Sequence, residues 1–141
     1  MCKKLWLGVL AVFVVLAVCD TIVNMLLLSS AYAATASLWR PPAEMKIWVF
    51  YVVYLVVAFF FTLIFSKGYE GKGVMEGLRY GFYVGMMMAI PTAFGTYGAM
   101  PIPCSMALQW FIYGLIEYIL CGMAVALVFG RQAAVTPVKP A

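Results

Sequence analysis

Polar and helix-breaking residues divide the chain into four long apolar stretches. These stretches cover approximately residues 5–31, 45–66, 74–97 and 104–130, and the connections between them are rich in proline, glycine or charge. About 20 apolar residues in a helix are enough to cross a bilayer, so each stretch is long enough to span one. The pattern predicts an all-α membrane protein: a single domain of four transmembrane helices, packed as an up-down bundle.

The connections contain residues that end helices. Pro41 and Pro42 cannot continue a helix, and the connection 67–73 holds three glycines and three charged residues. Pro91 falls inside the third stretch, where it removes a backbone donor and predicts a kink. Beyond Gly130, residues 131–141 are polar and proline-bearing, and we expect a short disordered tail.

The first stretch has three interpretations. It can be a transmembrane helix, or a cleaved secretory signal ending near Ala31-Tyr32-Ala33, or a lipobox at Leu16-Ala17-Val18-Cys19 that would make Cys19 a lipidated residue. A signal core spans only about 7–15 residues, which is shorter than this run. Val18 stands where a lipobox needs a small residue, and the chain after Asp20 stays apolar. The length therefore favours a retained membrane helix.

Composition and charge point to the same class. The chain is 67% hydrophobic and 10% charged, against about 25% charged residues in soluble domains. Its basic residues stand at helix ends without an aromatic-interleaved patch, so we expect no nucleic-acid partner. In a four-span arrangement, seven of them share the side of the two termini: Lys3, Lys4, Lys67, Lys72, Arg79, Arg131 and Lys139. Only Arg40 and Lys46 lie opposite, which predicts an inner-membrane protein with both termini in the cytoplasm.

The residue inventory argues against catalysis. The chain has no histidine, the commonest metal ligand and general base. Its four cysteines show no CxxC pair or zinc spacing. No nucleophile elbow or phosphate-binding loop is present. We therefore expect a protein that is not an enzyme and that carries no metal or cofactor.

Two acids lie deep within the predicted spans. Counted from the cytoplasmic ends, Asp20 is about 22 Å deep, Glu117 about 20 Å and Tyr54 about 18 Å. Asn24 follows Asp20 by one turn, and Tyr113 precedes Glu117 by one turn. An acid at this depth needs a proton, a partner or a water-filled cavity. Without a counter-ion at the same level, two acids cannot both stay ionised.

These five residues form the predicted site of the protein. One hypothesis is that the site handles protons, a small cation or a polar ligand. The other is that the acids are protonated and only pin the helices together by hydrogen bonds. The sequence leaves both open.

Small residues recur every fourth position at the start of the third stretch. Gly77, Gly81 and Gly85 form a ridge that allows close helix packing. The ridge suggests an alternative function, in which the protein is a structural or accessory subunit that packs in a homo-oligomer or a larger membrane complex.

Two resemblances add further expectations. Leu38-Trp39-Arg40-Pro41-Pro42, followed by Trp48-Val49-Phe50, resembles a loop of the tryptophan-rich sensory/translocator family. That family binds tetrapyrroles and cholesterol, which implies a tetrapyrrole- or lipid-binding module lined by Trp39, Trp48 and Trp110. The layout of the whole chain, with Glu76-Gly77 opening the third span, resembles small four-span bacterial membrane proteins of unassigned function. This second resemblance implies a fold and no activity.

Overall fold

The described part of the chain is largely helical. A computed structural model describes residues 2–133, and no strand occurs within them. The elements in order are α1 (Cys2–Ile22), a π-helical turn η1 (Val23–Leu27), α2 (Ser29–Ala34), two 3₁₀ turns η2 (Ala36–Leu38) and η3 (Pro42–Glu44), α3 (Ile47–Gly68), α4 (Val74–Ala99) and α5 (Cys104–Ala133). The predicted all-α class is confirmed.

Three helical segments are long and apolar enough to cross a membrane. Among the described residues these are Lys3–Leu27, Ile47–Gly68 and Cys104–Gly130. Helix α4 has the length, with 26 residues, but its glycines, tyrosines and threonines make it less apolar than the other three. The structure thus supports a membrane protein, and the fourth span stays a prediction.

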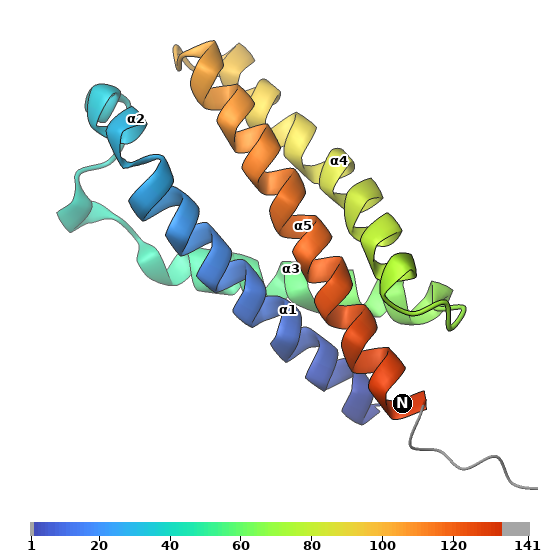
Figure 1. Ribbon diagram of the computed structural model, residues 1–141. Helices are drawn as coiled ribbons and strands as arrows, with labels where there is room; N and C mark the ends of the chain where they lie inside the picture. The colour runs from blue at the N-terminus through green and yellow to red at the C-terminus, as the bar shows by residue number, and fades with distance from the viewer. Residues whose placement is uncertain (1, 134–141) are drawn as a thin grey trace, which may run out of the picture.

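Helix α5 lies between α1 and α4. Figure 1 shows these three helices running alongside one another, with the start of α1, the start of α4 and the end of α5 at the same end of the molecule. Helix α3 contacts α1 and crosses behind it at a steep angle instead of running parallel to the bundle (Figure 1). The first half of α3 is therefore left exposed.

The main core forms where α1, α3 and α5 meet. Its buried members are Val9, Val12, Leu16, Ala58, Phe61, Phe65, Cys121, Val125, Ala126 and Phe129. Gly8 permits the close approach, because a Cβ atom there would lie 2.6 Å from Cγ2 of Thr62 and 3.2 Å from Cε2 of Phe129. Lipid tails are as apolar as these side chains, so dense packing holds the core together in a bilayer.

The glycine ridge of α4 packs against α5. A Cβ atom at Gly77 would overlap the carbonyl oxygen of Gly122, and one at Gly81 would overlap that of Tyr118. At Gly85 the added atom would lie 2.9 Å from Cδ1 of Leu115. The ridge is thus filled by the chain's own α5, and a partner subunit would need a different surface.

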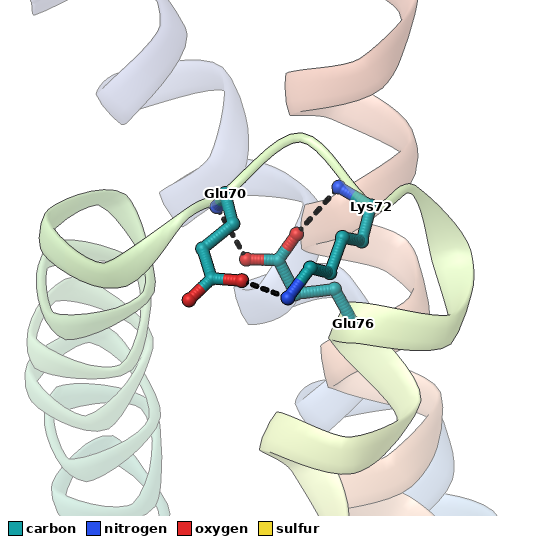
Figure 2. A network of polar contacts seen from close by, with 3 residues as sticks. All are labelled: Glu70, Lys72 and Glu76. Carbon is teal, nitrogen blue, oxygen red and sulfur yellow. Dashed lines mark hydrogen bonds and ion pairs between the residues drawn. The ribbon is translucent and has the colours of Figure 1, made fainter.

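Side-chain interactions stabilise the connection between α3 and α4 (Figure 2). The Glu76 carboxylate accepts hydrogen bonds from the backbone N–H of Glu70 at 2.6 Å and of Lys72 at 2.8 Å, while Lys72 forms an ion pair with Glu70. This hydrogen-bonded pairing with Lys72 lowers the pKa of the exposed Glu70 carboxyl. Gly71 and Gly73 have φ values of 82° and 72°, which glycine adopts without strain.

Helix boundaries differ from the sequence pattern at both ends of the chain. The first stretch is not one helix to residue 31, because α1 ends at Ile22 and a π turn follows. Helix α5 continues to Ala133, so the first three residues of the expected tail are helical, and residues 134–141 lie outside the described part. Helix α4 runs through Pro91 as one element, and a kink there stays a prediction.

Candidate functional site

Asp20, near the end of α1, is joined to α3. Its carboxyl group accepts a hydrogen bond from the hydroxyl of Tyr54, and both side chains are half-buried. The similar depth estimated from the sequence thus corresponds to a direct contact. The bond links the last turns of α1 to α3.

The π-helical turn begins three residues after Asp20. The side-chain amide of Asn24 donates a hydrogen bond to the Asp20 carbonyl oxygen at 2.9 Å. At the end of the turn, the backbone N–H of Leu28 donates to the carbonyl of Val23 at 2.9 Å, a bond between residues five apart. Such π turns are rare and occur frequently at functional sites. In the sequence, Asp20 and Asn24, one turn apart, are the signal for this π turn.

Hydrogen bonds extend from Asn24 to α5. The Tyr32 hydroxyl donates to Oδ1 of Asn24 at 2.7 Å, and Nε1 of Trp110 donates to the Tyr32 hydroxyl oxygen at 3.2 Å. Tyr32 and Trp110 therefore belong to the polar network, although the sequence pattern did not place them in it. The position of Tyr32 within a possible cleavage motif gives no indication of this contact.

Two of the tryptophans expected to line a ligand pocket pack on each other instead. Trp39 and Trp110 have ring centroids 5.8 Å apart, and Tyr32 lies 5.4 Å from Trp39. Trp48, at the start of α3, is 66% exposed and makes no aromatic pair with this cluster in the described part of the chain. Tyr32, Trp39 and Trp110 thus form a compact aromatic cluster, and a tetrapyrrole- or lipid-binding module stays a prediction.

Glu117 and Tyr113 lie on the face of α5 that turns toward α1. They line a cavity of about 290 Å³ together with Cys19, Ile22, Val23, Leu27, Ile116 and Leu120. No lysine or arginine lines this cavity, and within residues 2–133 no side chain or backbone group forms a hydrogen bond with the Glu117 carboxyl. A carboxyl group in such surroundings must be a neutral acid or be balanced by a cation from outside.

The structure thus divides the predicted residues into two adjacent groups. Asp20, Asn24 and Tyr54 are connected by hydrogen bonds, whereas Tyr113 and Glu117 line the cavity next to them. Cys19, the neighbour of Asp20 in the chain, lines the same cavity, so the two groups meet along α1. In residues 2–133, no cluster of three or more His, Cys, Asp or Glu side chains that could hold a metal is found.

Comparison with known proteins adds no assignment. No protein-family model, no curated protein sequence and no solved structure matches this chain significantly. Any functional conclusion therefore depends on the geometry of α1, α3 and α5.

Proposed function

We propose that this chain is a four-span inner-membrane protein whose acidic site between α1 and α5 takes up and releases a proton or a small cation. Helix α4, at 26 residues, would be about 39 Å long, which is enough to cross a bilayer. It packs along α5 from Gly77 to Ala89. The exposed residues of α4 are largely apolar, among them Phe82, Met87 and Ile90, and suit contact with lipid.

The placement of basic residues supports cytoplasmic termini. The ring of Tyr69, after α3, lies 5.6 Å from that of Phe129, near the end of α5, so the α3–α4 connection shares one end of the molecule with the C-terminal part of α5. The start of α1 lies at this end too (Figure 1). Lys3, Lys4, Lys67 and Lys72 belong to the segments at this end, whereas Arg40 and Lys46 lie in the connection that precedes α3. An excess of lysine and arginine marks the cytoplasmic side of a membrane protein.

The observation that carries the proposal is that one of the two acids has a hydrogen-bond partner and the other has none among the described residues. Asp20 already has a partner in Tyr54, and its role is to hold α1 against α3. Glu117 lines an apolar cavity and has no such partner among the described residues. Of the two, only Glu117 is free to exchange its proton for a cation without breaking a contact between helices.

Proton movement through reconstituted vesicles tests this proposal. The purified protein is placed in vesicles that contain a pH-sensitive dye, and a potassium diffusion potential drives protons inward. We expect the wild-type protein to raise the proton flux above that of protein-free vesicles, and Glu117→Gln to return it to the protein-free rate, because glutamine cannot carry a proton. Sodium and potassium uptake by the same vesicles distinguishes a cation from a proton.

Glu44→Gln is the matched control, since Glu44 lies in an exposed connection between helices. Its flux should equal that of the wild type. If Glu117→Gln transports protons and cations as fast as the wild-type protein while it remains folded, the proposed role of Glu117 is wrong.

A further inference from the structure

A second cavity, of about 400 Å³, opens at the other end of the protein from the aromatic cluster. It lies between the last turns of α3 and the first turns of α4, next to the connection shown in Figure 2. Its walls combine apolar side chains, including Ile64, Phe65 and Met75, with two basic and two acidic side chains, Lys72, Arg79, Glu70 and Glu76. None of these residues belongs to the acidic site.

The two acids that line this cavity already have partners within the protein. Glu76 accepts two hydrogen bonds from backbone N–H groups of the connection, and Glu70 is paired with Lys72. Arg79 is exposed, lines the cavity and forms no ion pair with any residue of the described chain. The guanidinium group is therefore available for an anion from outside the protein.

The cavity has the polarity of the boundary between lipid headgroups and lipid tails. Arg79 is the sixth residue of α4, about 8 Å along the helix from its first residue. Ile64 and Met75, which are 56% and 59% exposed, lie beside it and would face the bilayer. Tyr83, 67% exposed, adds an aromatic side chain of the kind found at membrane interfaces.

We propose that this cavity binds the headgroup of an anionic glycerophospholipid. The planar guanidinium of Arg79 matches the oxygens of a phosphate group, whereas the charge of Lys72 at the rim is balanced by Glu70. The acyl chains would cover Ile64 and Met75, which a free phosphate ion would leave exposed. Basic side chains on the cytoplasmic side of a membrane are the usual determinants of anionic lipid recognition.

Lipid-dependent thermal unfolding of the purified full-length protein in detergent tests this proposal. A ligand that binds the folded state raises the unfolding midpoint. We expect phosphatidylglycerol to raise it more than phosphatidylcholine does, and inorganic phosphate to leave it unchanged. Arg79→Gln should weaken the apparent affinity for phosphatidylglycerol about fivefold, the effect of one basic residue near an anionic surface.

Two further variants make the test specific. Arg40→Gln, an exposed arginine in the connection at the opposite end, should bind phosphatidylglycerol as the wild type does. Glu70→Gln should bind it several-fold more tightly, because it frees Lys72 and removes a negative charge from the rim. This gain cannot result from misfolding, so it decides the question even if Arg79→Gln is unstable.

Three results would overturn the proposal: equal effects of the two lipids, an unchanged affinity in Glu70→Gln or in a folded Arg79→Gln, or stabilisation by inorganic phosphate equal to that by phosphatidylglycerol. Glu117→Gln should keep the full response to phosphatidylglycerol, because Glu117 does not line this cavity. Failure of the lipid site and failure of the acidic site are therefore distinguishable.

Discussion

Gly77→Leu is expected to destabilise the protein more than the loss of any single hydrogen bond between its helices. A Cβ atom at this position would overlap the carbonyl oxygen of Gly122 and would lie 2.6 Å from Cβ of Ala126. Overpacking a tight site costs about 1–3 kcal/mol and occasionally more. We expect at least the upper end of that range, because the obstacle is the backbone of α5 and cannot rotate away.

The unfolding midpoint in detergent, followed by circular dichroism, measures this effect. Gly95→Leu is the matched control, since Gly95 lies on the same helix and nothing stands within 4 Å of a Cβ atom added there. It should unfold at or above the wild-type temperature, because glycine is a poor helix former. Equal losses of stability at the two positions would show that α4 and α5 do not pack through Gly77.

Tyr54→Phe is expected to have the second-largest effect. The substitution keeps the ring and removes the hydroxyl that donates to Asp20. A half-buried carboxyl group then loses its partner, and leaving a buried polar group unsatisfied costs about 1–3 kcal/mol. The loss should appear as a lower free energy of unfolding and as weaker attachment of α1 to α3.

Two comparisons isolate the hydrogen bond. Tyr51→Phe removes a hydroxyl one turn earlier on α3, from a side chain that is 50% exposed, and should change the stability little. In an Asp20→Leu background, Tyr54→Phe should be nearly neutral, because the acceptor is already gone. A cost that persists in that background would mean that the tyrosine hydroxyl acts through another group.

The two acids depend on each other through the position of α1. Cys19 and Val23, which flank Asp20, line the cavity that also contains Glu117. The bond between Asp20 and Tyr54 holds this part of α1, and it therefore helps to set the width of that cavity. In the proposed function the two acids would have separate roles, with Asp20 positioning α1 and Glu117 facing the exchangeable ion.

Hydrophobic length and helix-breaking residues were sufficient to determine the class of this protein and its main elements. The adjacent Pro41 and Pro42 interrupt an α-helix, and the glycines of 67–73 permit a sharp reversal. These are local constraints, so each can be deduced from the residues themselves. The periodic glycines also predicted a close helix contact, because small residues repeated every fourth position lie on one face.

Tertiary structure alone decided which helix faces met. The sequence gives only the depth of each residue along its helix, and Asp20, Tyr54 and Glu117 have similar depths. It does not show that Tyr54 donates a hydrogen bond to Asp20 while Glu117 lines a cavity. The sequence pattern also did not predict that the glycine ridge packs against α5 or that α3 crosses the bundle at a steep angle. Rotation about a helix axis and the choice of neighbour result from side-chain packing between segments far apart in the chain, and no local sequence pattern contains that information.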